Sequence, residues 1–351
     1  MRRSYDESDY NLDGDSLIQL EDGRILSFYF RKSYSLKIYE QKEFKEILSI
    51  KLGEILKQND KINSGWGTID LSVIQLKNMS ILVGFSIYLI EIKLNEKNFE
   101  SKVVFNYDEN ILNINELPDR RIMLITSNSI LVLNNFILKD KYNIKDNWRI
   151  IPVSLSNRYY GKFKQHFFST ILPDERIILR SFSTELSYHG GCGTHPPAEF
   201  THSKIIFLNT KNFEEIKTTE EFKSDCRDLI FENLIIIQAY HDIYLYDIKT
   251  LENIKKIKIK GEYSFFEKYN ENEIIAYSMY EDENDLLIFR VEGNDIVKSC
   301  EVKKQFKFKE VIGWNSYPII EYNNKILFVL KDKRIILLCH NAAIILNLGL
   351  E

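Results

Sequence analysis

LIQLEDGRIL, residues 17–26, places two short apolar runs on either side of a polar turn. Apolar runs that flank an Asp-Gly pair are typical of a β-hairpin, because these residues tolerate the backbone angles of a tight reversal. The arrangement recurs along the chain, and an isoleucine follows each turn. These isoleucines are Ile25, Ile81, Ile122, Ile177, Ile235, Ile274 and Ile326. Their mean spacing of about 50 residues predicts a fold built from repeated hairpin units.

A third apolar strand and a more polar fourth strand are predicted after each hairpin. The third strands are expected at residues 35–39, 87–90, 130–133, 204–208, 243–247, 286–289 and 334–337. The best fourth strands are residues 252–260 and 295–302, where polar and apolar residues alternate. Stacked sheets need this order because only the outermost strand borders solvent along its edge. We therefore predict an all-β fold, a β-propeller of seven four-stranded blades, with six blades as the alternative.

The repeat resembles that of the WD40-repeat β-propellers. Tyr246-Asp247-Ile248-Lys249-Thr250 stands where that family has Trp-Asp and the turn after it, and residues 20–26 match its hairpins. In other units this place is held by Tyr39-Glu40, Leu208-Asn209 and Phe289-Arg290. The resemblance covers nearly the whole chain in its period. It implies the propeller fold and no particular activity, because one fold hosts many functions.

The chain is interpreted as one domain with a short lead-in. It has 351 residues, of which 44% are apolar, enough for a sizeable core. Residues 1–14 are expected to form an acidic lead-in, and residues 15–351 a single propeller domain. Residues 343–348 are predicted to be a buried strand of the seventh blade. Two ways of closing the ring remain open: each blade is continuous in sequence, or the lead-in pairs with the last blade.

Cysteine usage and the chain ends bear on location. The four cysteines, Cys192, Cys226, Cys300 and Cys339, form no C-x-x-C pair, which predicts reduced thiols in a cytoplasmic or nuclear protein. The polar N-terminus lacks the apolar run of a secretory signal. Residues 335–350 carry no formal charge, but a membrane span needs about 20 residues. We expect two short buried strands there and no membrane contact, with a tail anchor as the alternative.

Strand alternation assigns the long connecting segments to one face. In an antiparallel blade, the turn between the second and third strands shares a face with the link to the next blade. Four long segments, residues 53–70, 153–165, 183–203 and 305–316, fall on this long-loop face. Aromatic and arginine residues dominate interface energies, so these segments predict a surface for a protein or peptide partner. The predicted contacts are Trp66, Arg158, Tyr159, Tyr160, Tyr188 and Trp314. The alternative is that these side chains only pack the loops onto the blades.

One segment carries candidate metal ligands. His189, Cys192, His195 and His202 lie within 14 positions. Imidazole and thiolate ligate Zn²⁺, and three such ligands would leave an open position for catalysis. A metal-dependent propeller hydrolase or lyase is therefore the alternative function, although an ordinary surface loop is the simpler interpretation.

The leading prediction is a non-enzymatic intracellular scaffold that binds a protein through the long-loop face. We expect no cofactor and a monomer within a larger complex. The formal net charge of −4 supplies no field that would attract nucleic acid. The lysines at 255, 256, 258 and 260 are predicted to form a solvated strand edge. Glycan or nucleic-acid binding through the same aromatic face is a third possibility.

Overall fold

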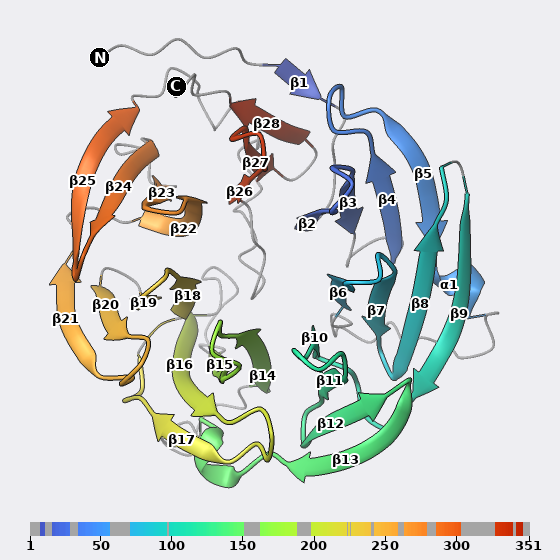
Figure 1. The fold of residues 1–351 in the computed structure, drawn as a ribbon, viewed down its shortest axis with the longest axis horizontal. Coiled ribbons are helices and arrows are strands. Elements are labelled where there is room, and N and C mark those ends of the chain that lie inside the picture. The colour runs from blue at the N-terminus through green and yellow to red at the C-terminus, as the bar shows by residue number, and fades with distance from the viewer. Residues whose placement is uncertain are drawn as a thin grey trace, which may run out of the picture. The chain divides into compact units, whose positions relative to one another are not determined.

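The computed structural model describes most of the chain. These are residues 8–10, 16–28, 34–56, 71–96, 98–150, 162–187, 198–222, 224, 226–239, 242–258, 263–278, 286–302, 327–339 and 342–346. Their strands form seven four-stranded sheets that follow one another along the chain. The predicted fold class is confirmed: the protein is an all-β propeller with seven antiparallel blades (Figure 1).

The chain divides into two compact units, and the first holds four sheets. It comprises residues 1–68, 95–98 and 227–351. The first sheet contains β2 (Ser16–Gln19), β3 (Ile25–Phe28), β4 (Ser35–Tyr39) and β5 (Glu46–Lys51), followed by the short helix α1 (Leu52–Ile55). The fifth contains β18 (Cys226–Ile230), β19 (Leu234–Ala239), β20 (Asp242–Asp247) and β21 (Asn253–Lys258). The sixth contains β22 (Tyr263–Asn270), β23 (Glu273–Ser278), β24 (Leu286–Glu292) and β25 (Asp295–Val302). The seventh contains β26 (Leu327–Val329), β27 (Ile335–Cys339), β28 (Ala342–Leu346) and β1 (Ser8–Tyr10).

The second unit comprises residues 69–94 and 99–226 and holds three sheets. The second sheet contains β6 (Leu71–Gln75), β7 (Ile81–Phe85), β8 (Tyr88–Leu94) and β9 (Phe99–Asn106). The third contains β10 (Asn113–Glu116), β11 (Ile122–Ile125), β12 (Ser129–Asn134) and β13 (Ile137–Asn143). The 3₁₀ helix η1 (Asp146–Trp148) follows it. The fourth sheet contains β14 (Lys162–Ile171), β15 (Ile177–Ser187), β16 (Ala198–Leu208) and β17 (Glu215–Thr218).

The tight turns between first and second strands follow one pattern. In five sheets a leucine N–H donates to the carbonyl four residues on, at 2.8 Å, and the residue before that carbonyl is left-handed, with φ between +68° and +92°. In four of these turns an aspartate accepts the N–H of an arginine two residues later and binds its guanidinium. The pairs are Asp22–Arg24, Asp119–Arg121, Asp174–Arg176 and Asp332–Arg334. The predicted hairpin repeat is confirmed at these turns.

The turn that resembles the WD40 position also recurs. Asp247 accepts the N–H groups of Lys249 and Thr250 at 2.8 and 2.7 Å, and Leu251 takes a left-handed conformation that buries its side chain. Glu40 and Asn209 cap matching turns in the first and fourth sheets. In the sixth unit the position predicted for this turn, Phe289-Arg290, is wrong. Residues 289–290 lie within β24, and the turn comes at residues 293–294.

The seventh sheet differs from its predicted boundaries. The turn at Leu330–Arg334 makes β27 the second strand, whereas residues 334–337 were predicted as the third. The turn predicted before Ile326 lies outside the described residues. The outermost strand is β1, which pairs with β28, so a seventh blade continuous in sequence is wrong. The predicted buried strand at residues 343–348 is confirmed for residues 343–346, which lie in β28 with Ile345 and Leu346 buried, and residues 347–348 lie outside the described part of the chain.

The outer strands carry a second repeated feature. A β-bulge interrupts the pairing of third and fourth strands in the first six sheets. Bulges increase strand twist and make an exposed edge a poorer template for other chains. On β21, Lys255 and Lys256 form ion pairs with Asp295 and Asp242, as expected of a solvated edge.

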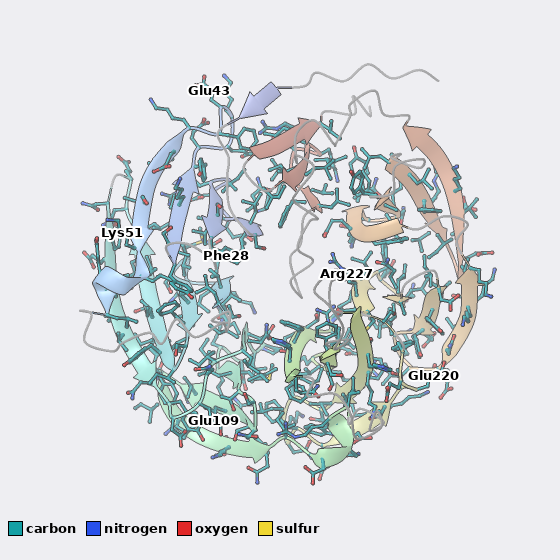
Figure 2. All side chains as sticks on the ribbon, turned by 180° about the vertical axis from the view of Figure 1, so that it is seen from behind. Phe28, Glu43, Lys51, Glu109, Glu220 and Arg227 are labelled. Atoms are coloured by element: carbon teal, nitrogen blue, oxygen red, sulfur yellow. The ribbon has the colours of Figure 1, made fainter. Side chains whose placement is uncertain are left out.

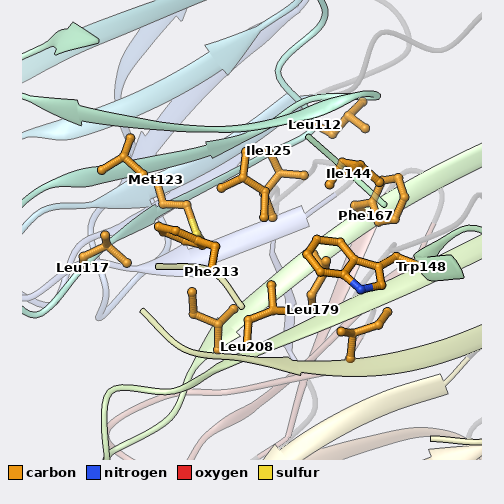
Figure 3. Close-up of a cluster of buried hydrophobic side chains, with 14 residues drawn as sticks. Leu112, Leu117, Met123, Ile125, Ile144, Trp148, Phe167, Leu179, Leu208 and Phe213 are labelled. Carbon is orange, nitrogen blue, oxygen red and sulfur yellow. The ribbon is translucent and has the colours of Figure 1, made fainter. Parts of the chain in front are cut away.

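Buried side chains fill the space between neighbouring sheets within each unit. Between the third and fourth sheets, a cluster that includes Met123, Phe167 and Phe213 is buried (Figure 3). Hydrogen bonds also join inner strands, from Ile114 N–H to Ser72 and from Ser169 N–H to Asn113. No helix among the described residues has the length and apolar character needed to cross a membrane.

Candidate functional site

The fourth sheet is longer than the others. β14, β15 and β16 have 10, 11 and 11 residues, whereas the strands of the other sheets have three to eight. Pairing continues to Lys162↔Leu186 and Ser187↔Ala198. This extended end lies on the side of the turn between second and third strands, which is the long-loop face.

Two segments that were predicted as long loops are partly strand. The segments 153–165 and 183–203 were expected to be long connections, but residues 162–165, 183–187 and 198–203 are strand. Their serine, threonine and aromatic residues favour strands when a partner strand satisfies the backbone. The connecting segments that remain, residues 151–161 and 188–197, lie outside the described residues.

Most of the predicted site residues also lie outside the described part of the chain. These are Trp66, Arg158, Tyr159, Tyr160, Tyr188 and Trp314 for the partner surface, and His189, Cys192 and His195 for the metal. Both sets therefore stay predictions. Among the described residues, no group of three or more His, Cys, Asp or Glu side chains could hold a metal ion.

His202 is the one predicted ligand that the structure places. It lies on β16 opposite Ser183, and its Nδ1 is 2.8 Å from Oε1 of Glu221. About a third of its side chain, 33%, is exposed. A carboxylate at one ring nitrogen is the usual companion of a histidine that ligates a metal through the other. His202 could thus offer Nε2 to a ligand.

A row of polar side chains crosses the sheet at this level. Gln165, Ser183 and His202 are paired across β14, β15 and β16, and so share one face. The Gln165 amide donates to Ser181 Oγ at 2.7 Å and to the Phe182 carbonyl at 3.1 Å, and accepts from Ile150 N–H at 3.3 Å. The Gln165 side chain thus has partners for both its nitrogen and its oxygen, which ties β14 to β15 at this level.

The opposite face of the same sheet buries a cation. Arg180 is 8% exposed, and its guanidinium lies 4.9 Å from the ring centre of Phe168. It donates a hydrogen bond to the carbonyl of Cys226. The ring of His166 stacks on Phe168 at 6.2 Å between centroids. These contacts hold the base of the extended end from its second side.

Trp148 anchors the chain that enters the predicted partner-binding segment. It is 1% exposed within the cluster of Figure 3, and its Nε1 donates to Oε2 of Glu215 at 2.6 Å. Burial raises the pKa of Glu215, but hydrogen bonds from Thr218, Trp148 and Asn147 outweigh that effect and lower the pKa. Nothing in the sequence around this tryptophan points to a buried role, and no local pattern distinguishes it from Trp66 or Trp314.

The third sheet presents a fixed turn on the same face. Glu109, labelled in Figure 2, accepts hydrogen bonds from Thr126 Oγ1 at 2.7 Å and Asn128 N–H at 3.0 Å. Arg149 donates from the other side to the Ser127 carbonyl, at 2.8 Å. The third and fourth sheets thus offer a fixed base from which the connecting segments emerge.

Comparison with known proteins supports the fold alone. No protein-family model and no curated protein matches the sequence. Among solved structures, the WD40 domain of Neurospora crassa Pan2 is similar at a TM-score of 0.61 and 6% identity, over 100% of this chain and 97% of that one. BBS1N in complex with ARL6DN gives 0.56 and 10%, over 99% and 98%. A catalytically inactive virginiamycin B lyase from Staphylococcus aureus, with quinupristin, gives 0.52 and 11%, over 98% and 100%.

The chain therefore resembles seven-bladed β-propellers, a WD40 domain among them. The similar structures include one that binds a protein and one that is an enzyme. At these identities neither role transfers to this chain.

Proposed function

We propose that the protein is a non-enzymatic, intracellular β-propeller scaffold that binds a protein partner through its long-loop face. The observation that carries the proposal is the extended end of the fourth sheet. It continues past the ordinary length of a blade strand and is tied down on both faces. Binding residues are commonly placed on loops that a rigid framework positions.

Strand pairing supports the choice of contact residues. Because Lys162 pairs with Leu186, the segment that ends before β14 and the one that begins after β15 attach at neighbouring strand ends. Tyr160 belongs to the first segment and Tyr188 to the second. Two tyrosines attached at neighbouring points suit one interface, because aromatic side chains contribute much of the binding energy. Arg158 and Tyr159 belong to the same segment as Tyr160, and Trp66 and Trp314 stay predictions from the sequence.

Co-purification from cells tests the proposal. The Tyr160→Ala/Tyr188→Ala variant should melt near the wild-type temperature and lose the proteins that wild type recovers. An Ile137→Ala/Ile216→Ala variant is the matched control, since it removes two side chains exposed on outer strands. The control should keep those proteins. If both variants fold and recover what wild type recovers, this face is not the binding surface.

A metal-dependent hydrolase or lyase is the second candidate, favoured by the carboxylate of Glu221 at Nδ1 of His202. His189, Cys192 and His195 would supply the further ligands. Elemental analysis after purification with added zinc decides between the two. Stoichiometric zinc that is lost in His202→Ala supports the enzyme, and metal-free wild-type protein rejects it.

A further inference from the structure

Arg149 lies on the long-loop face and has no acidic partner. Its Nη2 donates to the Ser127 carbonyl at 2.8 Å and to Asn128 Oδ1 at 3.0 Å, and both acceptors are uncharged. Among the described residues, no aspartate or glutamate forms an ion pair with it. Arginines in several sheets do form such pairs; these are Arg24, Arg120, Arg121, Arg176, Arg290 and Arg334.

The guanidinium of Arg149 is nevertheless held in place. The ring centre of Phe167, on β14, lies 5.9 Å from it. Asn128 is itself fixed, because its N–H donates to Glu109 at 3.0 Å and its carbonyl accepts from Ile144 N–H at 2.8 Å. Both hydrogen bonds of the guanidinium use Nη2, so the N–H groups of Nε and Nη1 remain for another acceptor.

The described acids on this side of the third and fourth sheets are held by other donors. Glu109 accepts hydrogen bonds from Thr126 and Asn128, Glu215 accepts from Trp148, and Glu221 lies 2.8 Å from His202. None of them could reach Arg149 without giving up these contacts.

The segments that connect the extended end contain no acid at all. Residues 151–161 follow Arg149 directly, residues 188–197 join β15 to β16, and neither segment has an aspartate or a glutamate. The first segment adds a second arginine, Arg158. The charge of these segments therefore complements an acidic partner.

We propose that Arg149 and Asn128 form a carboxylate-binding site, which takes an aspartate or glutamate side chain of the partner protein. The inference rests on the proposed function and adds the chemistry of the partner. The Nε and Nη1 donors form the planar fork that matches a carboxylate. The Asn128 amide oxygen already accepts from Arg149, and its amide nitrogen can supply a further N–H beside the fork.

Random peptides displayed on phage and selected on the folded wild-type protein supply the probe. The selected peptides should share an aspartate or glutamate, and a synthetic copy should bind Arg149→Gln about tenfold more weakly than wild type. Arg149→Lys keeps the charge but loses the fork, so its binding should fall between the two. Arg120→Gln is the matched control, since Arg120 is 60% exposed and pairs with Glu116 at the tight turn of the same sheet. The control should bind as wild type does.

The peptide itself gives a test that does not depend on how a variant folds. Changing its shared acid to the amide should weaken binding to wild type about tenfold and binding to Arg149→Gln much less. Equal losses with both proteins would place the carboxylate elsewhere and overturn the inference. A library whose peptides share no acid, or bind Arg149→Gln as tightly as wild type, would also overturn it.

Failure of this inference and failure of the proposed surface give different results. A peptide that needs Arg149 but binds Tyr160→Ala/Tyr188→Ala normally supports the carboxylate site and removes the two tyrosines from the surface. A peptide that needs the tyrosines but not Arg149 keeps the proposed surface and rejects the carboxylate site.

Discussion

Arg334 is expected to hold the seventh and first sheets together, and its removal should be costly. It lies in the turn between β26 and β27, where Nε donates to Asp332 Oδ2 at 2.9 Å. Its guanidinium also donates to the Gln41 carbonyl at 2.7 Å, in the turn between β4 and β5. The Phe44 ring lies 4.8 Å away. The prediction is that Arg334→Ala destabilises the protein far more than an equivalent arginine elsewhere.

The expected loss comes mainly from three contacts. The ion pair with Asp332 is partly exposed and contributes about 0.5 kcal/mol. The charged hydrogen bond to the Gln41 carbonyl contributes about 1.5 kcal/mol. The cation–π contact with Phe44 adds about 0.5–1 kcal/mol. Arg334→Ala should therefore lower the free energy of unfolding by about 2.5–3 kcal/mol, a large share of the roughly 5–15 kcal/mol typical of a domain.

Arg121 provides the matched control. It occupies the same turn position in the third sheet and binds Asp119 at 2.7 Å, and its other ion pair, at 3.8 Å, is with Asp140 of the same sheet. Arg121→Ala should cost about 0.5–1 kcal/mol. Thermal unfolding at neutral pH measures both variants, and at about 2 °C per kcal/mol the Tm should fall by about 5–6 °C and 1–2 °C. Equal losses would refute a special role for Arg334.

Four further predictions concern the same fold. Gly84→Val should destabilise the second unit by about 1–3 kcal/mol in chemical denaturation, since a Cβ there would lie 2.7 Å from Ile111 Cγ2. Trp148→Phe should lower the free energy of unfolding by about 1.5–3 kcal/mol and raise the pKa of Glu215, because a hydrogen bond to its carboxylate is lost. The variant should therefore lose less stability than wild type when the pH is lowered. Deleting residues 343–351 should give insoluble protein, because β28 is removed; a soluble monomer with unchanged Tm would contradict this. Burial raises the pKa of three turn aspartates, but the hydrogen bonds and charge of the neighbouring arginine outweigh it and lower the pKa. The stability that these carboxylates contribute is therefore present above pH 4 and is lost as the pH falls through their lowered pKa values. The three are Asp22, Asp174 and Asp332. Replacing all three by asparagine should flatten the stability profile below pH 4, and an unchanged profile would contradict it.

Repetition made the fold readable from the sequence. Alternating strands and tight turns are local patterns, and they recur along the chain from one sheet to the next. The hairpin around Asp22 and the turn at Asp247 appear where the sequence predicts them, because their hydrogen bonds join residues two to five apart. The seventh sheet was misassigned in part because its outer strand comes from the other end of the chain. Even so, Leu330–Ile335 has the same leucine, aspartate, arginine and isoleucine spacing as Leu20–Ile25, and that signal could have placed its turn.

The candidate site depended on contacts that no local pattern contains. The sequences of residues 162–165 and 198–203 are compatible with a loop or a strand. They form strands because they pair with β15. No local pattern marks Trp148 as a buried residue; its indole N–H is satisfied by Glu215, which is 67 residues away in the chain. The sequence by itself indicated most of the strands and tight turns and favoured seven blades, because these follow from periodicity and short-range hydrogen bonds. Only the tertiary structure decided which blade extends, which tryptophan is buried and which strand closes the seventh sheet, because each depends on partners distant in the chain.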